Sequence, residues 1–418
     1  MEVVEKNITT GTAGPARGTD PGLSQHLRGR IAREFRDRYE NEWGKRFVTH
    51  GTTPGPNAVR LDGNDYLGIT GHADIVNAQI AALRDQRDFV VQSGVFQLDS
   101  SPHARFEAAL ADFVGKDGAL LCQSGYTANL GLIQVVADRE TPVYVDSLAH
   151  MSLWEGVRAA GAVATAFRHN DPEHLARMVA RGGPGLVIVD SVYSTTGALC
   201  PLTRMVEVAE QGGCMILVDE SHSLGTHGPQ GRGLCAELGL SHRVHFITAS
   251  LAKAFAGRAG FFTMPHELRH YLMCHSFPSI FSSCLLPQEV AGLHATLGVV
   301  ERSDAERAAL VRNTRRLRTR LTELGYPIHQ GSEQIISLEA GPEKDTLALR
   351  DELERRNVFG AVFCAPATSR NRSMVRLTLN AGLTDAELSH VEAVAEEIAP
   401  IVKPWEWQIA RRQRTKPD

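Results

Sequence analysis

The chain has 418 residues, enough for a large domain and a smaller one with separate cores. Hydrophobic residues make up 43% and charged residues 22%, and the net charge is −4, so a nucleic-acid or anionic-membrane partner is not expected. No apolar run reaches the ~20 residues of a membrane span, and the N-terminal sequence lacks the pattern of a secretion signal. Seven scattered cysteines without a CxxC pair indicate reduced thiols, so we expect a cytoplasmic protein without a structural metal.

Two helices are expected before the first buried strand. The first covers residues 24–47, and it carries arginines that form either a solvated face or a site for an anionic substrate, Arg28, Arg30, Arg33, Arg36 and Arg38. The second begins at Ser101 and Pro102, a typical cap and first helical residue, and ends at Gly115. Residues 1–60 are interpreted as a leader with this first helical segment.

Short apolar runs then alternate with helical stretches or loops. The runs are Ala119–Cys122, Val143–Val145, Leu186–Val189, Met215–Val218 and Val244–Ile247. This rhythm predicts a mostly parallel sheet covered on both faces, within a large domain over residues 61–299. Polar residues follow each run, which places the ligand site at the carboxyl ends of the strands.

The C-terminal part is expected to form a smaller α/β domain over residues 300–418. A long helix is predicted over residues 304–324, with Gly325 as its stop. Short strands are predicted at Ile335–Leu338 and Met374–Leu379, and the last helix opens with a capping box that starts at Thr384.

Three features near the strand ends carry chemistry. Lys253 lies among small apolar residues after a strand, where a lowered pKa would favour the neutral amine that a Schiff base needs; a lone loop lysine is otherwise a solvated charge. Asp219 ends a strand and is suited to protonating a heteroaromatic nitrogen, or to capping the next helix. Ser124 to Tyr126 precede a helix, where free amides form an anion site, although single matches of this kind are common. His222 and His227 lack a third ligand at suitable spacing, so no metal site is predicted.

Taken together, these motifs resemble the α-oxoamine synthases, pyridoxal-phosphate (PLP) enzymes of the aspartate-aminotransferase fold (fold type I). The resemblance covers about Leu61 to Gly382. It rests on these motifs: Leu61-Asp-Gly-Asn-Asp-Tyr-Leu-Gly68, Ser124-Gly-Tyr-Thr-Ala-Asn129, Asp146 with His150 and Ser152, His169-Asn-Asp171, Val218-Asp-Glu-Ser-His-Ser223, Ser250-Leu-Ala-Lys253 and Arg376.

The resemblance implies a role for each matching residue. Lys253 would form the Schiff base and move the substrate's α-proton, Asp219 would face the pyridine nitrogen, and His150 would stack over the ring. The phenolic oxygen would be bonded by His222, and Ser194 would lie near the cofactor. The phosphate would be held by the backbone of Gly125 and Tyr126, by the helix start at Ser124, by the Ser250 hydroxyl, and by Ser283 of the second subunit of a homodimer. Arg376 would bind the amino-acid carboxylate.

Several positions depart from the common family pattern. Ser250 replaces a threonine, Ala252 a serine and Ser221 an alanine, and residues 93–102 lack the usual glycine-rich Ser-Arg stretch. With these departures, the chain is similar to one branch of the family, the cholera-type α-hydroxyketone autoinducer synthases. The resemblance implies condensation of a medium-chain acyl-CoA with 2-aminobutyrate or S-adenosylmethionine, with an active site at a dimer interface.

Other reactions stay open from the sequence. They are those of another α-oxoamine synthase (8-amino-7-oxononanoate, 2-amino-3-ketobutyrate or 3-ketosphinganine type), transamination and aldol cleavage. A non-catalytic module that binds the cofactor and senses a ligand is the alternative of a different class.

Overall fold

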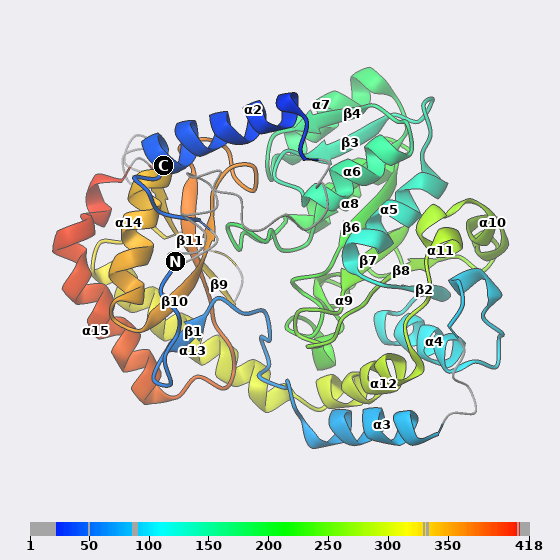
Figure 1. Ribbon diagram of the computed structural model, residues 1–418. Helices are drawn as coiled ribbons and strands as arrows, with labels where there is room; N and C mark the ends of the chain where they lie inside the picture. Colours follow the sequence, from blue (N-terminus) through cyan, green and yellow to red (C-terminus); the bar gives the residue numbers. More distant parts are fainter. Residues whose placement is uncertain are drawn as a thin grey trace. The chain divides into compact units, whose positions relative to one another are not determined.

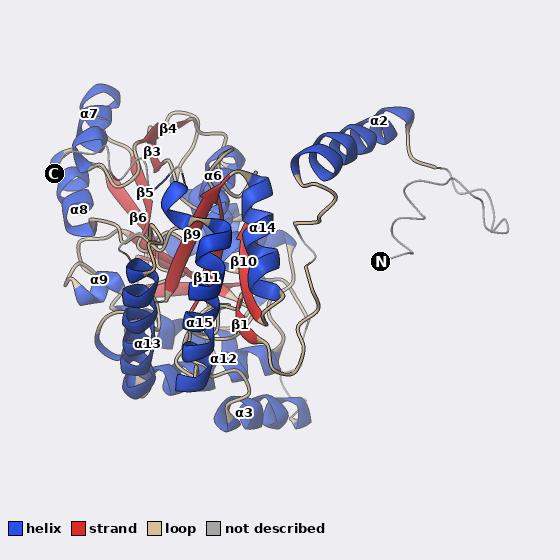
Figure 2. Cartoon of the chain, turned by 90° about the vertical axis from the view of Figure 1, so that its left-hand side faces the viewer, coloured by secondary structure: helices blue, strands red, loops and turns tan. Residues whose placement is uncertain are grey.

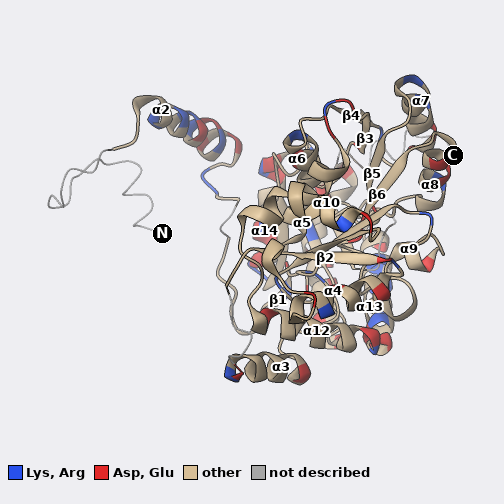
Figure 3. Ribbon diagram, turned by 90° about the vertical axis from the view of Figure 1, so that its right-hand side faces the viewer, with Lys and Arg blue, Asp and Glu red and all other residues tan. Residues whose placement is uncertain are grey.

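The computed structural model describes residues 22–48, 51–85, 91–328, 331, 334–407 and 409. The chain divides into two compact units, Met1–Gly51 and Thr52–Asp418. In the first unit, α2 (Gln25–Glu34) is capped by the Ser24 hydroxyl and continues into a π-helix, η1 (Phe35–Glu42). Figure 3 shows basic and acidic residues together along this segment. Four of its five arginines are exposed, which favours the interpretation as a solvated face.

The second unit contains a seven-stranded sheet with the order β2-β8-β7-β6-β5-β3-β4 (Figure 1). Only β8 runs antiparallel to its neighbours, so the predicted mostly parallel sheet is confirmed. The strands are β2 (Gly118–Cys122), β3 (Val143–Asp146), β4 (Ala164–Phe167), β5 (Leu186–Asp190), β6 (Met215–Asp219), β7 (Phe246–Ser250) and β8 (Gly260–Met264). Four of the five expected runs match strands closely. The fifth starts two residues later than predicted, at Phe246.

Helices cover both faces of this sheet because its central strands are apolar on both sides. In β5, Val187 and Val189 belong to one apolar core, whereas Leu186 and Ile188 belong to the other. One core includes side chains of α4 (Pro102–Val114), α7 (Pro172–Gly182) and α8 (Leu202–Gln211). The other includes side chains of α5 (Gly125–Val136), α6 (Met151–Ala159) and α10 (Leu268–His275). The predicted start and stop of α4 are confirmed, with Ser101 as its cap and Gly115 at φ 70°.

The same unit contains a second, four-stranded sheet with the order β1-β10-β11-β9 (Figure 2). Its strands are β1 (Val59–Leu61), β9 (Ile335–Gly341), β10 (Val358–Phe363) and β11 (Ser373–Thr378). Its helices are α13 (Asp304–Glu323), α14 (Glu343–Glu354) and α15 (Asp385–Val402). The predicted capping box of α15 at Thr384 is present. Since β1 pairs with β10, residues just before position 61 belong to this smaller sheet, and the boundaries at 61 and 300 stay a prediction.

This unit also contains the remaining helical elements. They are α3 (Ala73–Arg84), α9 (Leu234–Glu237), α11 (Phe277–Phe281), α12 (Pro287–Glu301) and the 3₁₀ turns η2 (Gly94–Phe96), η3 (Pro229–Gly231) and η4 (Pro404–Glu406). Within the described ranges, no helix combines the length and apolar character that crossing a membrane requires.

Candidate active site

The carboxyl ends of the parallel strands surround a cavity of about 200 Å³, which we call the lysine cavity. This is the edge at which open α/β sheets place their ligands. The lysine cavity is lined by Ser124, Gly125, Tyr126, Asn129, His150, Ser152, Asp190, Asp219, Ser221, His222, Ser250 and Lys253. Most of the residues singled out from the sequence therefore meet in one place.

Lys253 lies in the loop after β7, on the wall of the lysine cavity. Burial and, to a smaller extent, the positive charge of Arg376 lower the pKa of its amine to about 8, against the opposing effect of Asp219. The direction agrees with the argument from its apolar neighbours. A fraction of the amine is thus neutral near pH 8, as attack on a carbonyl carbon requires.

Asp219 ends β6 with its carboxylate buried at 4% exposure. One oxygen accepts a hydrogen bond from Asn129 Nδ2 at 2.7 Å, and the other accepts one from the Ser221 amide at 2.8 Å. The Asn129 amide also donates to Ser152 Oγ, at 2.9 Å. No arginine or lysine side chain pairs with Asp219 in the part of the chain that the structure describes. A buried carboxylate fixed by neutral donors is well suited to hold a cationic ring N–H.

The start of α5 forms another wall of the lysine cavity. Ser124 caps the helix by accepting from the Thr127 amide at 3.1 Å, so the preceding amides of Gly125 and Tyr126 have no intrahelical partner. A Cβ atom on Gly125 would lie 2.7 Å from Ser250 Cβ. Glycine therefore lets Ser250 approach the helix start, where amides and a hydroxyl form an anion site.

The two histidines of the lysine cavity are held in fixed orientations. His150 caps α6, and its Nδ1 lies 2.7 Å from Ser152 Oγ. His222 is buried, and its Nδ1 lies 2.5 Å from the Tyr66 hydroxyl. Burial lowers the pKa of both imidazoles, and the positive charges of Lys253 and Arg376 lower that of His222 further. His222 is therefore neutral.

Arg376 lies outside the lysine cavity, on β11 of the smaller sheet. It is buried at 5% exposure, and its guanidinium donates to the Ser194 carbonyl at 2.7 Å and to Asn64 Oδ1 at 3.1 Å. Its Cζ lies 4.7 Å from the ring centroid of Phe363. No carboxylate pairs with it among the residues described, its Nε has no partner, and burial lowers its pKa. A buried cation without a counter-ion is a suitable site for a ligand carboxylate.

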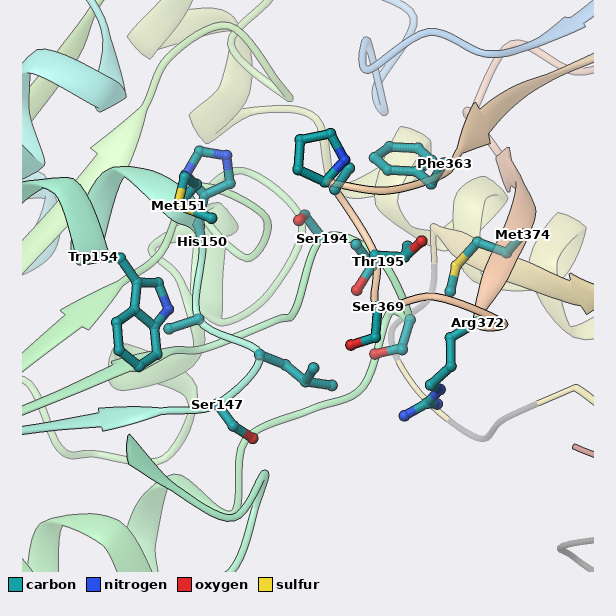
Figure 4. A pocket seen from close by; sticks show the side chains of 16 residues that line it. Ser147, His150, Met151, Trp154, Ser194, Thr195, Phe363, Ser369, Arg372 and Met374 are labelled. Atoms are coloured by element: carbon teal, nitrogen blue, oxygen red, sulfur yellow. The ribbon is translucent and has the colours of Figure 1, made fainter. Parts of the chain in front are cut away.

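Ser194 and Ser283 also lie outside the lysine cavity. Ser283 lies between α11 and α12 and pairs with Ser93 in an isolated β-bridge. The Ser283 carbonyl accepts a hydrogen bond from Gln123 Nε2 at 2.5 Å. Its expected contact with the phosphate of a second subunit stays a prediction. Ser194 lines a second cavity, of about 530 Å³ (Figure 4), and His150 lines both this cavity and the lysine cavity.

The second cavity lies between α6 and the β10–β11 pair. Apolar side chains on its wall include Met151, Trp154, Phe363 and Met374, and hydroxyl groups include those of Ser147, Ser194, Thr195, Thr196, Thr368 and Ser369. Apart from Ser194, the sequence did not identify these residues, because they come from distant segments without a motif. Tyr66, Asn129 and Ser152 were part of recognised motifs, but no role was assigned to them.

Comparisons with known proteins agree with this geometry. Residues 56–394 match the family "Aminotransferase class I and II". The CAI-1 autoinducer synthase of Vibrio campbellii is 44% identical over 90% of this chain and 95% of its own. The 8-amino-7-oxononanoate synthase of Mycolicibacterium gilvum is 31% identical over 81% of this chain and 89% of its own. A solved serine palmitoyltransferase from S. paucimobilis with bound PLP and myriocin superposes with a TM-score of 0.81, at 26% identity, over 91% of this chain and 99% of that one.

The lysine cavity fits the cofactor of this family. It offers an amine for the PLP aldehyde, a buried carboxylate for the pyridine nitrogen and a helix start for the phosphate. In the described ranges, no group of three or more histidine, cysteine or acidic side chains is placed to hold a metal ion. The fold, the cavity and the sequence matches together establish that the chain belongs to the α-oxoamine synthases of aminotransferase class I and II, whose cofactor is PLP.

Proposed function

We propose that this protein is an acyltransferase that condenses a medium-chain acyl-CoA with an amino acid or S-adenosylmethionine. The acyl carbon would bond to the α-carbon, the thioester C–S bond would break to release the CoA thiol, and the carboxylate would leave as CO₂. The product would be an α-aminoketone that serves as an autoinducer precursor. The observation that supports this function is that His150 lines two cavities, one that would hold the cofactor and amino acid and one that would hold the acyl donor.

Residues of the lysine cavity, together with Arg376 outside it, would each perform a task. PLP supplies an electron sink for the charge left on the α-carbon when its proton is removed. Lys253 would carry that proton away, since its lowered pKa suits an amine to act as a base. Asp219 would keep a proton on the ring nitrogen. Arg376 would bind the substrate carboxylate through its guanidinium, which has no acidic partner among the described residues.

The composition of the second cavity supports an acyl thioester as its ligand. Met151, Trp154 and Met374 provide an apolar wall for a hydrocarbon chain. The hydroxyl groups in the lining of this cavity would provide hydrogen-bond partners for the carbonyl and amide groups of the CoA arm. His150 lines both cavities, so the thioester carbon would meet the amino acid beside it.

A second copy of the chain would complete the active site. Four exposed apolar side chains gather around η2 and α11, namely Phe96, Leu98, Phe277 and Phe281, with exposures between 57% and 78%. The Ser93–Ser283 bridge links the same two segments. Such a patch is typical of an interface, and Ser283 beside it would reach the phosphate in the partner. Light scattering of Phe281→Asp tests this; the variant is expected to dissociate, whereas Val163→Asp at a distant exposed site is not.

Release of free thiol tests the reaction directly. The purified protein with PLP is incubated in three ways: with an acyl-CoA alone, with an amino acid or S-adenosylmethionine alone, and with the two substrates together. Acyl-CoAs of different chain lengths are compared. Thiol release and CO₂ are expected only with both substrates, and Lys253→Ala should abolish them. Mass spectrometry of the products then identifies the amino acid and the chain length.

The same assay separates the rival functions. A transaminase would form a keto acid without acyl-CoA, and an aldolase would release an aldehyde from a β-hydroxy amino acid. A sensor module would bind PLP and show no turnover. Any of these outcomes would exclude the proposed condensation.

A further inference from the structure

A hydrogen bond joins Tyr66, in the loop that follows β1 of the smaller sheet, to His222 on the wall of the lysine cavity. Tyr66 lies in the loop after β1 and is fully buried, and its hydroxyl oxygen lies 2.5 Å from His222 Nδ1. The same loop is tied to the end of β11, since the Ala381 amide donates to the Tyr66 carbonyl at 2.9 Å. Burial and this backbone hydrogen bond therefore hold Tyr66 in place beside His222.

The direction of this hydrogen bond follows from the surroundings. A neutral imidazole has one N–H donor and one acceptor nitrogen. If Nδ1 carried the proton, the Tyr66 O–H would be buried with no acceptor among the described residues. The positive charge of Arg376 also acts on Tyr66, and it favours a hydroxyl whose oxygen, not its hydrogen, faces the guanidinium. Burial raises the pKa of Tyr66, so the phenol keeps its proton.

We propose that Tyr66 is a positioning residue that fixes the tautomer of His222. The Tyr66 hydroxyl donates to Nδ1, and the proton of the imidazole is thereby kept on Nε2. The Nε2–H group has no acceptor in the described protein and belongs to a residue on the wall of the lysine cavity. It is thus available to donate to an oxygen of the bound cofactor.

The backbone of His222 is also held in place. The side-chain amide Nε2 of Gln334 donates to the His222 carbonyl, and both residues are buried. His222 is therefore held by its main chain and by one ring nitrogen, which leaves the second ring nitrogen for the ligand. The inference rests on the proposed cofactor role of His222, and it does not depend on the acyl-transfer reaction.

Nitrogen NMR of the full-length chain, labelled with ¹⁵N-histidine, tests this inference with and without PLP. The His222 signal is identified by its loss in His222→Ala. We expect the Nε2–H tautomer in the unsubstituted protein. In Tyr66→Phe we expect a mixture of tautomers and a PLP dissociation constant about tenfold to a hundredfold higher. Tyr326→Phe is the matched control, because that buried hydroxyl donates to a carbonyl of α15 at 2.8 Å and leaves His222 untouched.

The unsubstituted protein alone can overturn the inference, even if Tyr66→Phe does not fold. A His222 signal of the Nδ1–H tautomer would contradict it. So would an unchanged His222 signal in a folded Tyr66→Phe variant. In the His222→Ala background, adding Tyr66→Phe should change the PLP affinity less than about twofold, because the coupling passes through the imidazole. An additive loss would show that Tyr66 acts by another route.

Discussion

The lowered pKa of Lys253 leads to a measurable titration of its reactivity. With a pKa of about 8 in place of 10.5, about a tenth of the amine is neutral at pH 7, against about one part in three thousand for an unshifted lysine. Reaction with a small neutral acylating reagent should therefore rise through a midpoint near pH 8 and level off above pH 9. A lysine peptide in the same solution should titrate near pH 10.4.

The assay is competitive labelling of the cofactor-free protein, with quantification of the Lys253 peptide by mass spectrometry. Two substitutions test the causes of the shift. Arg376→Met removes a positive charge that lowers the pKa, so the midpoint should rise; Asp219→Asn removes the opposing negative charge, so it should fall. A midpoint above pH 10 in the unsubstituted protein would refute the reasoning. Midpoints that do not move in either variant would refute the assignment of causes.

Three further predictions concern other parts of the site. Gly125→Ala should lower the free energy of unfolding by about 1–3 kcal/mol in urea denaturation, because the new Cβ would meet Ser250, whereas Gly63→Ala in open space should not. Arg376→Met should raise the KM for the amino acid about tenfold or more while PLP still binds; an unchanged KM would remove Arg376 from the carboxylate site. The pKa of buried Glu220 is raised to about 7, so the folded state binds the extra proton between pH 4.5 and 7 and loses stability as the pH rises through that range. Replacement by glutamine should then stabilise the protein by about 3 kcal/mol at pH 8 and little at pH 4.5, and equal effects at both pH values would contradict this.

The parts of the fold that the sequence predicts are those controlled by local rules. The cap at Ser101, the left-handed Gly115 and the capping box at Thr384 all act within one turn, and each is present. The buried parallel strands were also recognisable, since both of their faces are apolar. Strand β8 was not predicted; it pairs with β7, just before it in the chain, and with β2, which is more than a hundred positions away.

In the candidate site as well, features set by nearby residues could be predicted, and contacts between distant segments could not. Asp219 ends β6, and Lys253 lies in the loop after β7. Both could be found because the carboxyl ends of parallel strands lie at the same edge of the sheet. The partner of Asp219, Asn129, comes from helix α5, and only the fold brings its side-chain amide to 2.7 Å from the Asp219 carboxylate. Trp154 and the β10–β11 segments form the second cavity from distant parts of the chain, with no spacing rule that connects them.

Reduction with borohydride tests the central claim most directly. The protein is reduced with PLP bound, digested and analysed by mass spectrometry, with Lys253→Ala as the control. We predict a single phosphopyridoxyl group, on the peptide that contains Lys253, and none in the variant. Attachment to a different lysine, or unchanged labelling of the variant, would contradict the assignment of this amine as the anchor of the cofactor.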